Sequence, residues 1–414
     1  MTDRGRESRS GGLASLSSAV GKRAAWAQNP WIVGAILALV VVAISVQSAV
    51  GGVKHFDQSG FAYTHYNNYV IFRQSYTHLV AGQDLYRLYP AEYWDLFKYS
   101  PAFALLVAPL AWMPVLPGLI LWNACNALVL LTGFSALPGL VPRARMYAFA
   151  FVLIELITSL QSAQSNALIA GLIILALVQL ESRRVALATL FITLTVVIKL
   201  FGVVAFALLL LYPGRWKGAA WALAWIAIFA ALPLLVVDVS QLTMLYRSWY
   251  ELLQNDHSTS LGLSVSGWLV TWFGVEQKLL TIAAGAAIFC LPLLRRSLYR
   301  DLRFRALYLA SCLLWIVIFN HKAESPTFVI AVAGVAIWFA FSEPSPLNLA
   351  LLLLTFVFTN LSSTDVFPRS IKVQWVTPYV LKAVPCILVW MKLVVDQFTL
   401  SRRADGAATA VPAD

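Results

Sequence analysis

The chain has 414 residues, of which 60% are hydrophobic and only 12% are charged, and its formal net charge is +11. Its mean hydropathy of +0.76 excludes a soluble globular protein and indicates many membrane-spanning helices. The apolar runs are continuous and not alternating, which favours an all-α polytopic membrane protein over a β-barrel. The excess positive charge lies in short loops between these runs, where it predicts membrane topology and no nucleic-acid partner.

Residues 1–29 are rich in Ser, Arg and Gly, so we expect a disordered cytoplasmic N-terminus and, at 399–414, a disordered cytoplasmic tail. Residues 30–398 are expected to form a single transmembrane domain. A helix needs about 20 apolar residues to cross a bilayer, and this rule predicts about 12 spans. They lie near residues 31–50, 115–137, 146–162, 164–181, 184–198, 201–212, 217–237, 276–294, 305–320, 326–342, 346–360 and 376–396.

Basic residues set the predicted orientation. The segment before the first span carries five of them, which places the N-terminus in the cytoplasm: Arg4, Arg6, Arg9, Lys22 and Arg23. Alternation through the spans then places six further segments on the same side, all but one of them rich in Lys or Arg: PGLVPRARM, ESRR, YPGRWKG, RRSLYRDLRFR, SEPSP and the C-terminal SRRADG. This topology requires 98–114 to be a partly inserted helix and 185–211 to be a pair of short helices with Lys199 at their outer tip.

The first non-cytoplasmic loop, 51–114, is predicted to be a lid at the membrane surface. Its sequence FAYTHYNNYVIFRQSYTHLVAGQDLYRLYP mixes aromatic rings with amides, histidines and both signs of charge. Such a segment suits short amphipathic helices lying against the lipid headgroups. Composition does not rank its polar candidates, which are Asp57, Asn67, Asn68, Arg73, Asp84 and Asp95.

Further polar clusters collect on the same predicted face. Lys199 lies in an apolar run, where a cation costs about 3 kcal/mol or more at mid-bilayer and therefore faces protein, water or an anion. It either contacts a phosphate or extends to the interface as an ordinary snorkelling lysine. Gln164 and Asn166, at the start of a span, are candidates to bind substrate hydroxyls, although amides also bridge membrane helices.

Titratable residues occur in two other outer segments. In IFNHKAESPTF, Glu324 is a candidate general base, with His321 or Lys322 beside an anionic leaving group. The alternative is a solvated turn in which Glu324 caps the helix that Pro326 starts. Asp256 and His257, in NDHSTS, are either substrate contacts or capping residues, and capping is favoured.

Glu155 is the lone acid within a span. We expect it to be a structural carboxyl, because it lies away from the outer clusters in the predicted topology.

Cofactor and metal motifs are missing from the sequence. It has no GxxxxGK[ST], no GxGxxG between a strand and a helix, no HExxH and no CxxC. The four cysteines all lie in apolar runs, where thiols behave as small hydrophobes. We therefore expect no cofactor and no metal, and an activated donor or energy source that comes from the membrane or an ion gradient.

The ordered set FKYSP with APLAWMP, LWNACNALVLL, QSAQSNALIAGLIILAL and IKLFG, after the lid, resembles the family 87 glycosyltransferases, also called domain of unknown function 2029. That family belongs to the C superfold of polytopic transferases that use polyprenol-phosphate sugars. The resemblance covers most of residues 31–320. It implies inverting, metal-independent transfer of a mannose- or arabinose-like sugar to a lipid or cell-envelope glycan, on the outer face of a bacterial plasma membrane.

The resemblance also implies an early acid that deprotonates the acceptor. The family opens its first lid helix with an Asp-aromatic pair, and counting back from Gly82 and LYRLYP places Asn68 at that position. An amide does not serve as a base. Glu324, Asp57, Asp256 and Asp365 are the candidate replacements, and His321 matches a late outer histidine of related enzymes. We expect Glu324 or Asp57 as the base.

The remaining expected contacts divide between phosphate and sugar. Lys199, Arg73 and His321 are expected near the phosphate, and Gln164, Asn166 and Asn68 near the sugar hydroxyls. Because Asn68 replaces the family acid, the alternative is a non-catalytic lipid-phosphate binding protein, flippase or transporter.

Overall fold

The computed structural model describes residues 30–55, 60–255 and 261–401, and most of these residues are helical. The lid end of the chain contains α2 (Pro30–Val50), a two-stranded antiparallel pair β1 (Val53–Lys54) and β2 (Tyr63–Thr64), α3 (Asn67–Val80), α4 (Pro101–Leu106) and α5 (Ala108–Trp112). The middle contains α6 (Val115–Ala136), α7 (Pro142–Gln161), α8 (Asn166–Glu181), α9 (Val185–Ile198), η2 (Leu200–Leu211), α10 (Arg215–Ala231), η3 (Leu232–Leu235), α11 (Val239–Asn255) and α12 (Val265–Phe273).

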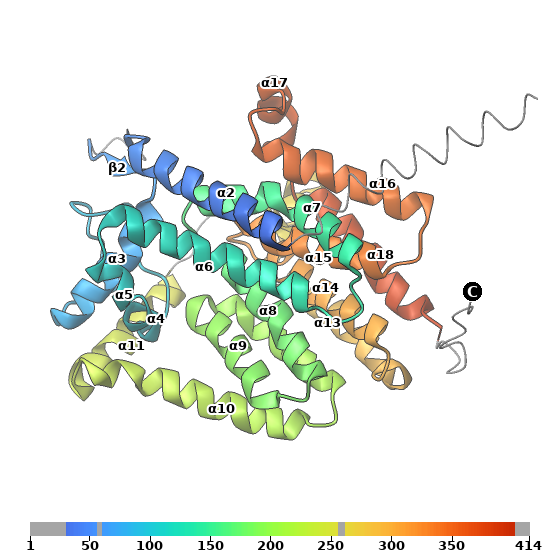
Figure 1. Ribbon diagram of the computed structural model, residues 1–414, viewed down its shortest axis with the longest axis horizontal. Coiled ribbons are helices and arrows are strands. Elements are labelled where there is room, and N and C mark those ends of the chain that lie inside the picture. Colours follow the sequence, from blue (N-terminus) through green and yellow to red (C-terminus); the bar gives the residue numbers. More distant parts are fainter. Residues whose placement is uncertain (1–29, 56–59, 256–260, 402–414) are drawn as a thin grey trace, which may run out of the picture.

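The last third contains α13 (Lys278–Cys290), η4 (Leu291–Leu294), η5 (Arg296–Leu298), α14 (Leu302–Ile318), η6 (Ser325–Thr327), α15 (Phe328–Phe341), α16 (Pro346–Thr355), η7 (Phe356–Asn360), η8 (Leu361–Ser363), α17 (Arg369–Ile371), η9 (Lys372–Val376) and α18 (Val384–Thr399). The helix pair α14 and α15 forms the centre of the bundle, with α7, α8 and α18 packed around it (Figure 1). Both central helices are buried on nearly every face, as expected of helices that are apolar all round.

Hydrogen bonds sort the helix ends into two sets. At one end, Arg305 at the start of α14 and Tyr212 after η2 both bond to Glu181, the last residue of α8. At the other end, Lys199 after α9 bonds to Asn166, the first residue of α8. Helices α8, α9, η2 and α14 therefore alternate in direction between these two ends, as the predicted order of the loops requires.

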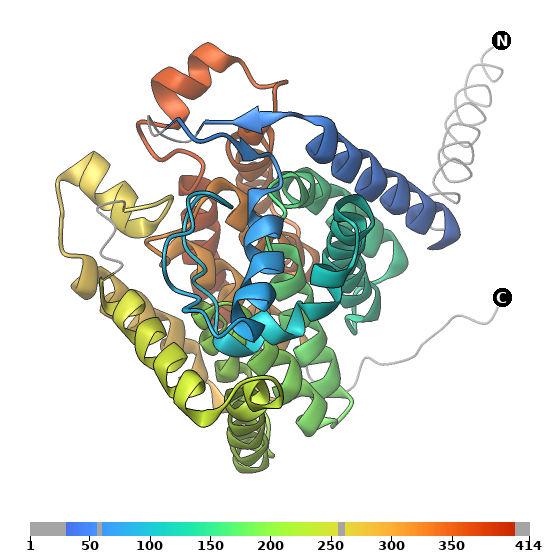
Figure 2. The same ribbon diagram turned by 90° about the vertical axis from the view of Figure 1, so that its left-hand side faces the viewer.

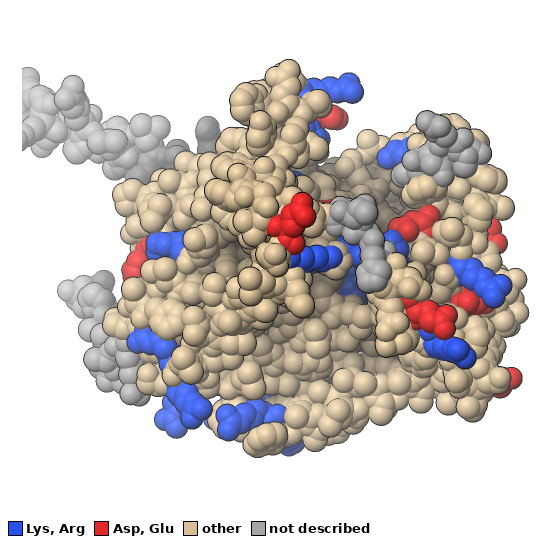
Figure 3. Space-filling view, turned by 180° about the vertical axis from the view of Figure 1, so that it is seen from behind, with Lys and Arg blue, Asp and Glu red and all other residues tan. Residues whose placement is uncertain are grey.

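The lid lies across the second set of helix ends, and Figure 2 looks directly onto it. Helix α3 packs on α4 and α5. The amphipathic helix α11 joins the lid through Gln241, which donates to Leu79 O at 2.8 Å, and Ser248, which donates to Asp84 at 3.0 Å. Seen from behind, Lys and Arg predominate at the end away from the lid, charges of both signs lie at the lid end and near the middle, and most of the remaining surface is uncharged (Figure 3).

Five helices among the described residues are long and apolar enough to cross a membrane, namely Trp31–Val50, Val115–Ala136, Pro142–Gln161, Arg215–Leu235 and Pro346–Ser363. Shorter apolar helices occupy Asn166–Glu181, Val185–Ile198, Leu200–Leu211, Lys278–Leu294 and Ser325–Phe341. The chain is thus an all-α, multi-pass membrane protein. The count of about 12 spans stays a prediction.

Two local predictions can be compared with the backbone. The expected pair of short helices is confirmed, because α9 and η2 meet at Lys199, whose extended backbone (φ −143°, ψ 124°) ends one helix and starts the other. The expected continuous helix at 376–396 is wrong. Its first part is irregular, with Pro378 in it and Val380 at φ +56°, and α18 begins only at Val384.

Candidate active site

Four side chains at the lid end form one hydrogen-bonded group, called here the Glu324 group. The Lys199 ammonium donates to Asn166 Oδ1 at 2.9 Å and to Gln164 Oε1 at 3.2 Å. The amide of Asn166 also donates to Gln164 Oε1, at 2.6 Å. Gln164 Nε2 in turn donates to Glu324 Oε2 at 3.1 Å. An ammonium and a carboxylate therefore lie on either side of two amides.

The turn before α8 positions the two amides. Ala163 has a φ of +48°, which is unfavourable for a residue with a side chain and persists only where the surroundings fix it. Two long-range bonds do so: Trp122 Nε1 donates to Ala163 O at 2.9 Å, and Asn68 Nδ2 donates to Ser162 O at 2.8 Å. The lid and α6 thereby set the direction in which Gln164 leaves the backbone.

A second turn, 319–327, positions Glu324. Glu324 is the N-cap residue of η6 and forms a capping box with Thr327, as the helix-capping alternative predicted: the Glu324 backbone N–H donates to Thr327 Oγ1 at 3.3 Å, and the Glu324 side chain accepts from the Thr327 backbone N–H. Pro326 lies at the start of η6, where its missing N–H costs nothing. Asn166 Nδ2 donates to Pro326 O at 3.0 Å, so the Glu324 turn is bonded directly to the start of α8. The Glu324 side chain belongs to an exposed residue, whereas Gln164 and Asn166 are buried.

Glycine is required where another segment reaches this turn. Gly262 has a φ of +60°, and a Cβ there would lie 2.4 Å from the carbonyl oxygen of His321. The close approach allows Leu263 N to donate to Ala323 O at 2.9 Å. The backbone before α12 therefore braces the Glu324 turn from a third side.

Several charges flank the group. Burial and, next, the positive charge of Lys98 lower the pKa of Lys322, while Asp95 opposes that shift. Burial and then the charge of Lys278 lower the pKa of His321, so its imidazole is neutral at pH 7. The edge of the Glu324 group thus carries lysine charge and a neutral imidazole.

The Glu324 carboxylate also affects the pKa of Tyr99, in the lid. Burial and, next, the negative charge of Glu324 raise the pKa of its hydroxyl well above the ordinary value, which keeps it protonated.

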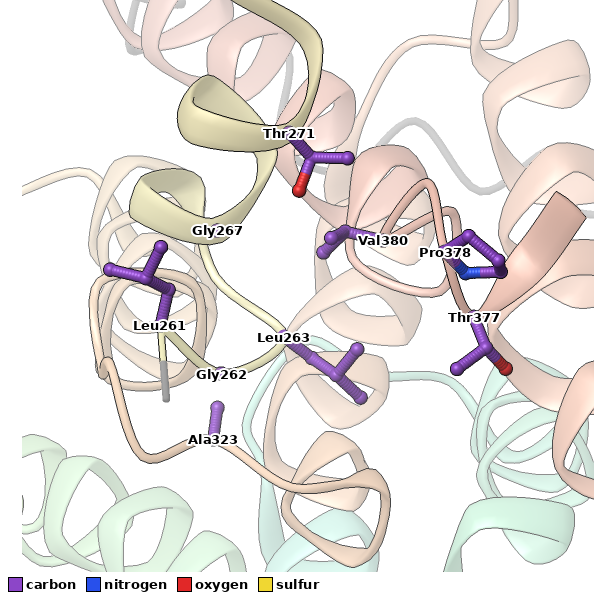
Figure 4. A pocket seen from close by; sticks show the side chains of 9 residues that line it. All are labelled: Leu261, Gly262, Leu263, Gly267, Thr271, Ala323, Thr377, Pro378 and Val380. Atoms are coloured by element: carbon purple, nitrogen blue, oxygen red, sulfur yellow. The ribbon is translucent and has the colours of Figure 1, made fainter. Parts of the chain in front are cut away.

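A cleft of about 400 Å³ opens beside the Glu324 turn (Figure 4). Ala323 forms part of its floor, and the segment before α12 and the turn before α18 form its walls. It is lined mostly by apolar side chains and glycines: Leu261, Gly262, Leu263, Gly267, Thr271, Ala323, Thr377, Pro378 and Val380. Polar atoms nevertheless contribute more of the accessible surface of the cleft than apolar atoms do, so the cleft offers both apolar side chains and polar groups to a ligand.

The family model of glycosyltransferase family 87 matches residues 97–364, well over half of the chain. The chain belongs to glycosyltransferase family 87. Comparison with curated proteins gives no match. The matched range contains all four members of the Glu324 group, whereas Asn68 precedes it. This family 87 protein is therefore a membrane glycosyltransferase whose central polar group lies inside the family region.

The predicted site residues of this glycosyltransferase separate in the structure. Gln164, Asn166, Lys199 and Glu324 come together, and Asn68 lies beside them through its bond to Ser162 O. His321 lies on the Glu324 turn, three residues before the carboxylate. Asp57, Asp256 and His257 lie outside the described residues.

Arg73 was expected near the phosphate, but its guanidinium is directed elsewhere. It donates to the carbonyl oxygens of Leu110, Ala111 and Met113, at 3.2, 3.2 and 3.1 Å. These carbonyls end α5, so Arg73 caps that helix. None of these bonds joins Arg73 to the Glu324 group.

The sequence reasoning missed Lys382. This lysine is 5% exposed and forms an ion pair with the fully buried Glu155, at 2.8 Å. Glu155 is hydrogen-bonded, as expected of a structural carboxyl. The expectation that it lies away from the outer polar clusters is wrong, because its partner Lys382 also contacts Ser325, the residue after Glu324. A lone cation in the apolar run VTPYVLKAVPC was the available signal.

Proposed function

We propose that this glycosyltransferase moves a mannose- or arabinose-like sugar from a polyprenyl-phosphate donor to a lipid or cell-envelope glycan. The reaction takes place on the non-cytoplasmic face of a bacterial plasma membrane, with both termini in the cytoplasm. The observation that supports this proposal best is the exposed Glu324 carboxylate, held by Gln164 in one group with Lys199.

Glu324 acts as the general base. Its carboxylate takes the proton of an acceptor hydroxyl, and the hydroxyl oxygen forms a bond to the anomeric carbon. The bond from that carbon to the phosphate oxygen breaks, and the electron pair leaves with the polyprenyl phosphate. Attack opposite the leaving group inverts the anomeric centre. The proton ends on Glu324, so charge and atoms balance.

The leaving phosphate is stabilised by cations. Lys199 bonds to amide oxygens, and an arriving phosphate oxygen is a stronger acceptor for its ammonium. Lys322 and Lys98 add positive charge at the edge. Gln164, Asn166 and Asn68 hold sugar hydroxyls, and the polyprenyl chain passes the apolar side chains of the cleft beside Ala323.

One observation favours a second candidate function. Asn68 occupies the position at which the family acid is expected, and its amide is already bonded to Ser162 O. A protein that kept the lipid-phosphate cavity without the acid would bind or move the lipid and leave its sugar in place.

The test uses the full-length protein in nanodiscs, incubated with radiolabelled polyprenyl-phosphate sugars and a membrane-lipid extract. We expect label transfer by the wild type and its loss in Glu324→Gln, with donor binding retained. Binding of polyprenyl phosphate without any consumption of donor would overturn the transferase mechanism and support the second candidate.

A further inference from the structure

A buried polar cluster lies directly behind the Glu324 turn. Lys382 Nζ bonds to Glu155 Oε1 at 2.8 Å and to Ser325 Oγ at 2.8 Å, and it also contacts Ser363 Oγ. Ser363 Oγ donates to the same Glu155 oxygen at 2.8 Å. One ammonium thereby joins α7, η6, η8 and the turn before α18.

The position of this cluster links it to the site. Ser325 follows Glu324 in the chain, and the Glu324 side chain accepts from Gln164 on the opposite side. The turn is therefore bonded from both directions, through Gln164 to the substrate group and through Ser325 to Lys382. Movement of the Lys382 ammonium would move the backbone that carries the base.

The same anchor adjoins a strained wall of the cleft. Val380 has a φ of +56°, which is a rare conformation for a β-branched residue. Val380 lies two residues before Lys382, and it lines the cleft together with Thr377 and Pro378. Such a backbone persists only where its surroundings determine it, and the Lys382 contacts supply that constraint.

Stability alone does not account for a buried ion pair. Removing two charges from water is costly, and apolar residues of similar volume often replace such a pair without loss of stability. What apolar replacements cannot reproduce is a directional bond to Ser325 Oγ. The pair is thus better suited to fixing a geometry than to stabilising the fold.

We propose that Lys382 is a positioning residue that acts through Ser325 to place Glu324, with Glu155 as its counter-charge. The inference rests on the proposed function, because it assigns Glu324 as the base. It extends that function by tying the base to the wall of the cleft in which the lipid chain lies.

The test replaces the pair by apolar residues, Glu155→Leu with Lys382→Met, so that no unpaired charge remains. A displacement of about 1 Å of a catalytic group costs about 100-fold in rate. We expect kcat to fall about 10- to 100-fold, with KM for the donor within about 3-fold and the thermal midpoint within a few degrees. Lys382→Arg should recover part of kcat.

The matched control is the double variant Glu181→Leu with Arg305→Met, which removes the ion pair at the other end of α8. Its kcat per folded molecule should equal that of the wild type. Unchanged kcat in the Glu155/Lys382 double variant would overturn the positioning role. So would a kcat loss that merely follows the folded fraction.

A second readout does not depend on activity. Amide hydrogen exchange in the peptide spanning 319–328 should be at least about 10-fold faster in the Glu155/Lys382 variant than in the wild type, and unchanged in the control. If the wild type transfers no sugar, the proposed function fails. Unchanged exchange in that case would overturn the positioning role as well.

Discussion

The two ends of helix α8 carry charged groups that are built differently. At its last residue, Glu181 accepts from Arg305 Nη2 at 2.8 Å and from the Tyr212 hydroxyl, and the Arg305 and Glu181 side chains are only 14% and 16% exposed. Opposite charges contact each other, and both carboxylate oxygens are bonded. This group is closed and joins α8, η2 and α14.

At the first residue of α8, opposite charges are present but kept apart. Lys199 donates to the amide oxygens of Gln164 and Asn166, and the bond to Glu324 comes from a neutral amide. Because amides separate the charges, both remain able to bind a ligand of opposite sign. The two carboxylates at the ends of α8 thus differ in whether a cation contacts them directly, as Arg305 contacts Glu181, or is separated from them by amides, as Lys199 is from Glu324.

The largest expected effect tests the open end. Glu324→Gln keeps the shape and the bond to Gln164 but removes the base, and general bases contribute about 10²- to 10⁴-fold to rate. We expect transfer to fall by that factor while the thermal midpoint stays unchanged, measured by label transfer and thermal unfolding. Glu181→Gln is the matched control and should show the reverse pattern. Equal loss of stability in both variants would remove the distinction between the ends.

A substitution at the closed end of α8, where Glu181 pairs with Arg305, should lower the stability of the fold and leave transfer unchanged. Arg305→Met leaves the mostly buried Glu181 without its cation, and removing one partner of a buried pair costs about 3 kcal/mol. We expect a lower thermal midpoint and an unchanged kcat per folded molecule. Lys217→Met serves as the control for loss of a positive charge, because Lys217 lies on the same predicted loop side and forms no ion pair among the residues that the structure describes. A kcat defect in folded Arg305→Met would mean that this end also serves the reaction.

A smaller effect is expected for the open cation. Lys199→Met leaves only neutral amides behind, so little stability should be lost. A charge-assisted bond to a phosphate contributes about 1.5–3 kcal/mol, which corresponds to a 10- to 100-fold rise in donor KM or fall in kcat/KM. Donor titration in nanodiscs measures it, with Lys199→Arg as the charge-preserving control. Unchanged donor affinity would identify Lys199 as an ordinary snorkelling lysine.

The contrast also shows what sequence can predict. Apolar runs and basic loops are local properties, so the helical class, the alternation of helix direction and the helix junction at Lys199 followed from the sequence. Gln164, Asn166 and Lys199 were recognisable because polar residues at the outer ends of apolar runs are rare. Their grouping with Glu324 matched the prediction that outer clusters share one face.

The remaining features depend on contacts between distant positions. Lys382 and Glu155 are 227 residues apart, and neither residue alone indicates that they form a pair. The break before α18 depends on the positive φ of Val380, a backbone conformation that is unfavourable for a β-branched residue and that its sequence therefore does not predict. Arg73 was predicted to bind an anion because the sequence shows its charge. The sequence does not show that the carbonyl oxygens of Leu110 and Met113 accept hydrogen bonds from its guanidinium.

The smallest expected change in stability and transfer is that of Asn68→Asp. This variant tests most directly whether Glu324 is the base at the open end of α8. Asn68→Asp restores the acid at the family position but replaces the N–H that donates to Ser162 O with a second acceptor. The lost bond and the repulsion between the carboxylate and the carbonyl should cost about 1–2 kcal/mol and loosen the turn that carries Gln164. We therefore expect a slightly lower thermal midpoint and transfer equal to or below that of the wild type. A rise in transfer would place a competent base at 68 and reduce Glu324 to a partner of Gln164. Asn67→Asp is the neighbouring control, since its amide bonds the lid residue Trp94 and not the Gln164 turn.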